Sequence, residues 1–462
     1  MGVSSTKRNI EEEPENPKEE PPLKKSKLSS GAEGEPCCST ESLDQKTPDK
    51  VLGWADLPYV ALLQIYSFLP NKYRYNMALT CQAWSKPFAR PEIWRSVSFR
   101  FDSHEDYRAK LFCEYLSLSG VRYLDINCAN STNSPINEFC SLLHLNKFLQ
   151  CFITCGNTKL IALNLTHLSS MSNWFKWLWN EDRMVVLYEL LACQTDLKYL
   201  NLSGAELKQE QGLALLGAAG QRCGTTIQCL KIDHFFAKDV QRDNQFSTDF
   251  TVTMEYFPKL VHLTVGIQYL SNELLNSLAN FGSLKCLCVH SNTTRELIQP
   301  STESWDYLRL SCQNLQVHYM LKNIGSRSIF LNILTPGIPL TSLEWELEKY
   351  WGQNSGLYCC RYIADNYKNT LKHLDFTLNE TSQWSLEMYS EIVDKCTKLK
   401  ALNVKSIDST SKTFKSAMRK CVRKTVNGQA KNEIGQFTLN GVNVPQGQSW
   451  INNILEWVLG TY

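Results

Sequence analysis

Cysteine and histidine are the residues of this sequence whose types and spacing could support chemistry. The chain of 462 residues has 18 Cys and 8 His. His262, His290 and His373 occupy equivalent or neighbouring positions in successive copies of a short apolar motif, and Cys286 and Cys288 lie close by. One interpretation is a metal site or a Cys–His nucleophile built across the copies; the other is a set of polar residues on a binding surface. We predict the second, with no catalytic residue, no metal ligand and no cofactor.

No catalytic motif in the sequence supports an enzyme. There is no GxSxG nucleophile elbow, no HExxH and no paired acid motif. No pair of CxxC or CxxH motifs lies at zinc-finger spacing, and the vicinal pairs Cys37–Cys38 and Cys359–Cys360 cannot chelate a metal as a CxxC pair would. We therefore predict a non-catalytic protein whose thiols are reduced and mostly pack as small apolar residues.

Charge and apolar patterning argue against nucleic-acid and membrane partners. The 48 Lys and Arg against 46 Asp and Glu give a formal net charge of +2, unlike a basic nucleic-acid-binding protein. No run approaches the length of apolar sequence that spans a bilayer. Residues 1–20 are charged and lack an apolar core, so we expect no secretory signal and a nuclear or cytoplasmic location.

Residues 1–50 have the composition of a disordered tail. They contain no Phe, Trp or Tyr and hold six of the 16 prolines. Such a segment cannot bury enough apolar surface to offset its ordering entropy. Lys24, Lys25 and Lys27 form a basic cluster downstream of Lys7 and Arg8, at a spacing suited to a bipartite nuclear import signal. An ordinary solvated charge run is the alternative, and both stay open.

Residues 51–101 predict a module of three short helices. Leu62, Ile65, Tyr66 and Leu69 recur at three- and four-residue spacing, which places them on one face, and Pro70 ends that run. The stretch resembles an F-box at Leu57, Pro58, Leu62, Leu63, Ile65, Phe68, Leu69, Leu79, Cys81, Trp84, Ile93, Trp94 and Arg95. It departs at Tyr73, where many F-boxes carry Asp.

The F-box resemblance implies docking onto a Skp-type adaptor, and through it onto the cullin and RING subunits of a ubiquitin ligase. The residues that the resemblance assigns to adaptor binding are Leu57, Pro58, Leu62, Ile65, Leu69, Cys81, Trp84 and Trp94.

Residues 102–410 repeat an apolar residue, a second one three positions later and a third two positions after that. The copies are Val121-Leu124-Ile126, Leu160-Leu163-Leu165, Leu197-Leu200-Leu202, Ile227-Leu230-Ile232, Leu260-Leu263-Val265, Leu284-Leu287-Val289, Leu340-Leu343-Trp345, Leu371-Leu374-Phe376 and Leu399-Leu402-Val404, with a degenerate copy near Leu315–Val317. This is the strand signature of leucine-rich repeats. With helical stretches between the strands, it predicts an α/β solenoid of horseshoe type. The alternative, a doubly wound sheet, lacks a glycine-rich phosphate loop.

Alternation along each predicted strand separates a buried face from a concave face. The second and third motif residues should point inward, and the residues beside them should form the surface that binds a protein substrate. The residues that we assign to this surface are Tyr123, Asp125, Tyr199, Asn201, Lys231, His262, Thr264, His373 and Asp375. They show no single charge sign, so the substrate cannot be named from them.

Residues 411–462 are expected to form a helical cap. Phe414, Met418 and Val422 lie four residues apart, which predicts a helix with one buried stripe and a basic outer face. Residues 449–459 are strongly apolar and should either cover the open end of the solenoid or fold back onto its concave face.

An F-box followed by leucine-rich repeats resembles the substrate receptors of SCF-type E3 ubiquitin ligases, in particular the divergent-repeat members among the "F-box only" proteins. We therefore predict a substrate-recognition subunit. The alternative is a non-catalytic scaffold or inhibitor that binds its partner without ubiquitination.

The basic cluster of the tail can be tested directly. If Lys24, Lys25 and Lys27 act in nuclear import, changing all three to Ala should shift the protein toward the cytoplasm, because the basic side chains are what an import receptor binds. Imaging of the tagged protein measures the shift. An unchanged distribution would assign the cluster to the solvated charge run.

Overall fold

The structure, a computed structural model, describes residues 53–100, 118–128, 135–171, 181–237, 244–292, 299–347, 353–378, 385–406, 436–439 and 442–444. The expectations for the tail of residues 1–50, for the helix with Phe414, Met418 and Val422, and for the apolar end at 449–459 lie outside the described residues. Within the described part, no helix is long and apolar enough to cross a membrane.

Short helical segments open the described chain. They are η1 (Trp54–Asp56), α1 (Tyr59–Phe68), α2 (Asn71–Ala78), α3 (Gln82–Ser85) and η2 (Pro91–Trp94). Pro58 and Pro70 directly precede α1 and α2, where the missing N–H costs little because the first helical residues have no intrahelical acceptor. Leu62, Tyr66 and Trp94 are buried at the centre of these helices. The prolines therefore keep the helices short, as the sequence predicts.

A sheet of 13 strands follows, with its strands in chain order. They are β1 (Ser96–Arg100), β2 (Tyr123–Asn127), β3 (Ala162–Thr166), β4 (Tyr199–Asn201), β5 (Cys229–Ile232), β6 (His262–Gly266), β7 (Cys286–Asn292), β8 (Gln316–Lys322), β9 (Leu340–Leu347), β10 (His373–Leu378), β11 (Ala401–Ser406), β12 (Gln436–Leu439) and β13 (Val442–Val444). All neighbours are parallel except β12 and β13.

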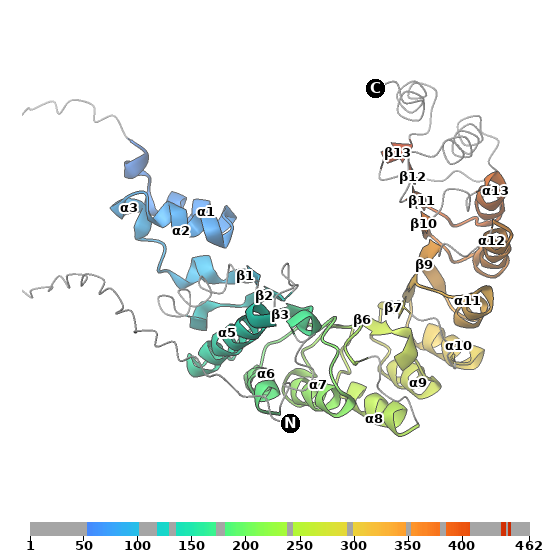
Figure 1. The fold of residues 1–462 in the computed structure, drawn as a ribbon, viewed down its shortest axis with the longest axis horizontal. Coiled ribbons are helices and arrows are strands. Elements are labelled where there is room, and N and C mark those ends of the chain that lie inside the picture. Colours follow the sequence, from blue (N-terminus) through green and yellow to red (C-terminus); the bar gives the residue numbers. More distant parts are fainter. Residues whose placement is uncertain are drawn as a thin grey trace, which may run out of the picture. The chain divides into compact units, whose positions relative to one another are not determined.

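Helices connect successive strands and lie along one side of the sheet (Figure 1). They are α5 (Pro135–Thr154), α6 (Glu181–Cys193), α7 (Gln209–Cys223), α8 (Asn244–Met254), α9 (Asn272–Phe281), α10 (Thr302–Ser311), α11 (Arg327–Ile333), α12 (Gln353–Tyr367) and α13 (Leu386–Lys395), with short turns η3 (Leu118–Gly120), η4 (Leu168–Met171) and η5 (Ile267–Tyr269). A strand and a helix per repeat, in one parallel sheet, form an α/β solenoid of the leucine-rich-repeat kind. The predicted fold class is confirmed.

The predicted inward residues stack from strand to strand. Leu200 of β4 lies in register with Leu163 of β3 and Leu230 of β5, and all three are fully buried. On the helical side, Leu187, Leu190 and Leu191 of α6 are buried as well, on the face that their spacing predicts. The core is therefore a continuous layer between the sheet and its helices.

Two strands, the first of the sheet and the second from its other end, carry copies of the motif that the sequence analysis missed. Trp94, Val97 and Phe99 have the spacing of the motif, and β1 pairs with β2 although it lies within the range assigned to the F-box. Near the other end, Phe437 and Leu439 of β12 follow Ile434 at the same spacing. The first copy was missed because it begins with an aromatic residue within the F-box resemblance. The second was missed because it lies in the range 411–462, where a helical cap was expected.

The degenerate copy of the motif begins one residue earlier than expected, at Asn314 instead of Leu315. Val317 of β8 holds the second motif position, in register with Leu287 of β7, and Tyr319 follows it into the core. Asn314 then falls at the first position, where its backbone has a positive φ of 65°. A register shift between Val317 and His318 adjusts the pairing with β9.

The alternation along β4 can be tested with two adjacent substitutions. Leu200→Ala should leave a cavity in the stacked layer and destabilise the protein by about 2–5 kcal/mol. Tyr199→Ala should cost much less, because the Tyr199 side chain faces away from the core and is only partly buried. Thermal melting of both variants beside the wild type measures the difference. Earlier melting of Tyr199→Ala than of Leu200→Ala would place the strand register one residue off.

Candidate functional site

Arg74 of α2 joins the short helices from the inside. Its guanidinium donates hydrogen bonds to the backbone carbonyls of Tyr66 (3.1 Å) and Leu69 (2.8 Å). It also donates to the carbonyl of Ile93 and lies 5.3 Å from the centre of the Trp94 ring. Burial lowers the pKa of Arg74, but an arginine in a protein keeps its charge. The carbonyl acceptors therefore offset the cost of burying that charge.

Three aromatic side chains hold the segments around Arg74 through their polar atoms. The Tyr66 hydroxyl donates to the carbonyl of Trp84 (2.7 Å), and the Trp84 indole N–H donates to the carbonyl of Trp54 (2.8 Å). The Trp94 indole N–H donates to the carbonyl of Phe88 (2.6 Å). These bonds give a module of fewer than 50 residues a defined arrangement that its small core alone would not fix.

The predicted adaptor-binding residues divide between the interior and the surface. Leu62 and Trp94 are buried, so they support the module from within and offer no surface to a partner. The other predicted residues keep accessible surface: Pro58 is exposed, and Leu57, Ile65, Leu69, Cys81 and Trp84 are half-buried.

The short helices also expose large apolar side chains that the assignment of adaptor residues left out. Val60 and Phe68 of α1 are 73 % and 78 % exposed, and Leu79, which ends α2, is 67 % exposed. Exposed apolar side chains on a small module are typical of protein-binding surfaces. Phe68 and Leu79 are among the residues that resemble an F-box, so the signal was present in the sequence.

On the sheet, the predicted substrate residues do not share one environment. Tyr123 and His373 are exposed, and Asp125, Tyr199, Lys231, His262 and Asp375 are half-buried. Asn201 and Thr264 were expected to face solvent, but only 8 % and 5 % of their surfaces are exposed. These two residues therefore offer little surface to a partner. The Asn201 side chain is held against its own strand end, because its oxygen accepts hydrogen bonds from the Ser203 amide (3.0 Å) and hydroxyl (2.7 Å).

Several of these side chains contact the neighbouring strand instead of standing alone. The Asp125 carboxylate accepts from the Ser98 hydroxyl of β1 (2.7 Å) and from the Asn164 amide of β3. The Lys231 ammonium lies 5.6 Å from the centre of the Tyr199 ring. Polar contacts therefore link outward side chains across β1, β2 and β3 and across β4 and β5.

Asp233, which directly follows β5, lies at the centre of a polar chain that the sequence analysis did not predict. Its carboxylate accepts from the Ser203 hydroxyl and pairs with Nδ1 of His290 on β7 at 3.1 Å. Burial raises the pKa of Asp233, but hydrogen bonds from His290 and Ser203 outweigh this and lower it to about 2. Asp233 is therefore ionised. Because His290 pairs with this carboxylate, we no longer consider His290 a candidate metal ligand.

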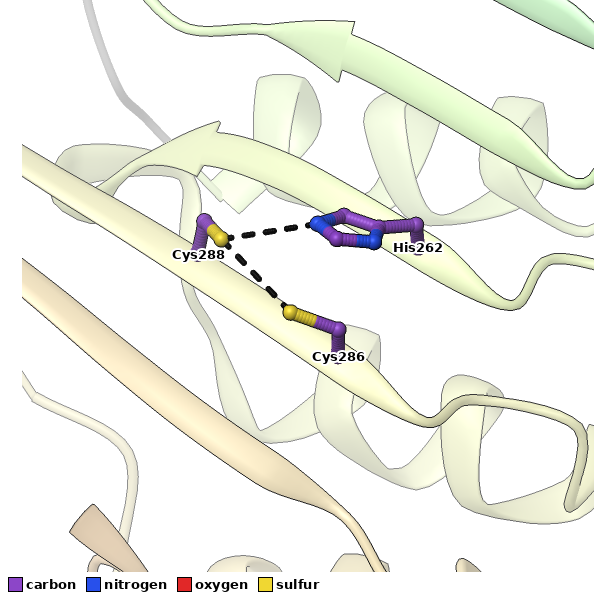
Figure 2. A group of neighbouring side chains, drawn as sticks. All are labelled: His262, Cys286 and Cys288. Carbon is purple, nitrogen blue, oxygen red and sulfur yellow. Dashed lines mark hydrogen bonds between the residues drawn. The ribbon is translucent and has the colours of Figure 1, made fainter. Parts of the chain in front are cut away.

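His262, Cys286 and Cys288 form the one group of possible metal ligands in the described part of the chain. Their ligand atoms all lie within 4.8 Å of one another, and Figure 2 shows them facing one another from β6 and β7. The Cys286 and Cys288 sulfurs are 3.7 Å apart, and the Cys288 sulfur is 3.7 Å from Nε2 of His262.

The two thiols of this cluster have opposite pKa shifts. A hydrogen bond from Cys286 lowers the pKa of Cys288, opposed by burial and assisted by His262. The same hydrogen bond, together with burial, raises the pKa of Cys286. The two thiols therefore titrate as a coupled pair that shares one proton. A thiolate beside an imidazole can act as a metal ligand or a nucleophile.

Comparison with known proteins identifies the first module. Residues 54–100 match the F-box-like family model. Over 52 residues the chain is 33 % identical to "F-box/LRR-repeat protein 21" of Mus musculus. That alignment covers 11 % of this chain and only 12 % of the relative, far less than two thirds of its length.

Solved structures resemble the chain only weakly. The leucine-rich repeat-containing protein LegL7 of Legionella pneumophila has a TM-score of 0.36 at 17 % identity, over 68 % of this chain and 94 % of its own. The Rad7 and Elc1 complex of yeast gives 0.33 at 12 % identity, over 78 % and 84 %. The repeats and the strand register of the chain itself define the solenoid. Residues 54–100 form an F-box-like domain, and a leucine-rich-repeat-like solenoid follows it.

Proposed function

We propose that this protein is the substrate-recognition subunit of an SCF-type E3 ubiquitin ligase. The observation that carries the proposal is the F-box-like domain at residues 54–100. In this proposal the domain binds a Skp-type adaptor, and through it the cullin and RING subunits, while the solenoid binds a protein substrate. The protein itself performs no bond chemistry: it raises the effective concentration of a substrate lysine near the loaded carrier enzyme.

The exposed apolar side chains of the F-box-like domain support adaptor binding. A partner that covers Phe68 and Leu79 would remove two large apolar side chains from water, and such side chains dominate the binding energy of many interfaces. Pro58 and Leu57 lie at the start of α1 and keep accessible surface as well. Arg74 and the indole hydrogen bonds hold these positions, so the surface is formed before the partner binds.

The concave face of the sheet supports the second half of the proposal. Its half-buried polar side chains come from many adjacent strands, and this gives a wide surface for a folded or extended protein partner. The rival function is a scaffold or inhibitor that holds the same kind of partner without ubiquitination. For a substrate receptor, degradation of the bound partner requires the adaptor. For a scaffold or inhibitor, it does not.

Adaptor binding can be tested with a pair of variants matched for exposure. Leu79→Ser should weaken binding of a purified Skp-type adaptor by roughly tenfold, because it removes an apolar anchor worth about 1.4 kcal/mol. Leu310→Ser is the control, because Leu310 of α10 is similarly exposed at 70 % but belongs to the solenoid.

The Leu57→Ala/Pro58→Ala variant should abolish capture of the adaptor while its melting temperature stays near that of the wild type. Wild-type binding by this double variant would rule out the adaptor function.

Substrate binding can be tested on the concave face. The Leu57→Ala/Pro58→Ala variant serves as a substrate trap, because partners that it holds should escape ubiquitination and accumulate. Adding Lys231→Glu should release these partners, because it reverses a charge on the concave face of β5. Lys198→Glu is the matched control, since Lys198 is exposed just before β4 and does not belong to the strands. Quantitative mass spectrometry of captured proteins, with and without proteasome inhibition, measures both effects. Partners whose turnover is independent of the F-box-like domain would favour the scaffold.

A further inference from the structure

The cluster of His262, Cys286 and Cys288 is built by the sheet itself. His262 begins β6 and lies in register with Cys286 of β7. Cys286 and Cys288 are two residues apart on one strand, so the period of the strand places both thiols on the same face. Between them, Leu287 is fully buried, and this anchors the strand in the core. The three ligand atoms are therefore positioned by rigid backbone rather than by a loop.

The spacing of the cluster fits a tetrahedral metal ion. Zinc binds sulfur at about 2.3 Å and imidazole nitrogen at about 2.0–2.1 Å. A tetrahedral angle then separates two sulfur ligands by roughly 3.8 Å and a sulfur from a nitrogen by roughly 3.6 Å. The sulfur–sulfur and sulfur–nitrogen distances in the cluster are both 3.7 Å. Two of the three separations therefore match those that a bound ion requires, and the third, between Cys286 and His262, lies within 4.8 Å.

A disulfide fits the same atoms less well. A bond between two sulfurs needs a separation of about 2.05 Å with a specific dihedral angle. The observed 3.7 Å is a contact distance, and His262 would have no part in a disulfide. A neutral imidazole and two thiols are, by contrast, the soft and borderline donors that zinc prefers over calcium or magnesium.

A fourth donor is available on the next strand. His318 of β8 lies in register with Cys288. Its Nε2 is buried and has no hydrogen-bond partner, which is costly for a polar atom unless something binds it. The ring nitrogens of His318 are not among the ligand atoms that lie within 4.8 Å of one another, so the ring would have to turn toward the ion to complete the site.

We propose that His262, Cys286 and Cys288 bind a zinc ion on the concave face of the solenoid, with His318 as the fourth ligand. The ion would join β6, β7 and β8 across three repeats in the middle of the proposed substrate surface. This site is independent of the F-box-like domain, and the proposal does not rest on ubiquitination.

The proposal can be tested by metal titration of the full chain. The purified protein is reduced, stripped of metal and titrated with Co²⁺, which reports thiolate ligands through a charge-transfer band in the near ultraviolet and tetrahedral geometry through visible bands. We expect one equivalent of Co²⁺ to bind with these bands and Zn²⁺ to displace it. Reduced wild-type protein without a thiolate band would overturn the proposal. A Cys286–Cys288 disulfide in the protein as purified, with no metal binding after its reduction, would overturn it as well.

Variants assign the ligands. Cys286→Ser and Cys288→Ser should each abolish the thiolate band or weaken Co²⁺ binding by more than about 100-fold, which exceeds the loss from removing a supporting residue. His262→Ala should weaken binding by at least tenfold. Cys155→Ser is the control, because Cys155 is an exposed thiol outside the sheet. Loss of binding in the control variant with retention in Cys288→Ser would place the metal elsewhere and contradict the proposal.

The fourth ligand has its own readout. His318→Ala should keep the thiolate band but shift the visible bands, because water would replace nitrogen at the ion, and binding should weaken by at least tenfold. Unchanged visible bands would remove His318 from the site. Zinc should also raise the melting temperature of the wild type and leave that of Cys288→Ser unchanged, because only a folded protein that binds the ion gains stability from it.

Discussion

The structure depends on the stacking of short parallel strands, none of which can bury its apolar side chains alone. Each strand contributes a few inward residues, such as Leu200 and Leu230, and each of these is covered by its equivalents on both sides. Stability is therefore shared between neighbouring repeats. Because the strand period is two, the same constraint that buries one set of side chains presents the other set on a single face. The core and the proposed binding surface follow from one alternation.

The F-box-like domain meets the opposite constraint, because it is too small to be held by apolar burial alone. Its solution is a buried charge. The Arg74 guanidinium reaches carbonyls from α1 and η2, and a further bond of 3.4 Å reaches the carbonyl of Ser96 at the start of β1. One side chain thus links the helices to the first strand of the sheet, and β1 in turn pairs with β2.

The sequence predicts the fold well because the fold is periodic. The spacing of Leu197, Leu200 and Leu202 recurs along the chain, and a local pattern is sufficient to place strands and inward residues. A feature that depends on a single contact between distant segments cannot be predicted from a local pattern. Nothing in the sequence near Arg74 identifies carbonyl partners that come from three other segments. The copy at Trp94 was missed for a smaller reason, since its first residue is aromatic and lies within the F-box resemblance.

The candidate sites illustrate the same limit from the functional side. His262, His290 and His373 look equivalent in the sequence, yet the structure separates their roles: His290 pairs with Asp233, and His373 is exposed. Only His262 meets two thiols, because its neighbour in register happens to be Cys286. In a solenoid, chemistry arises from the register between adjacent repeats rather than from any one repeat. A motif confined to one repeat cannot describe such a site, and for this reason a cluster with metal-like spacing can form where no metal-binding motif is present.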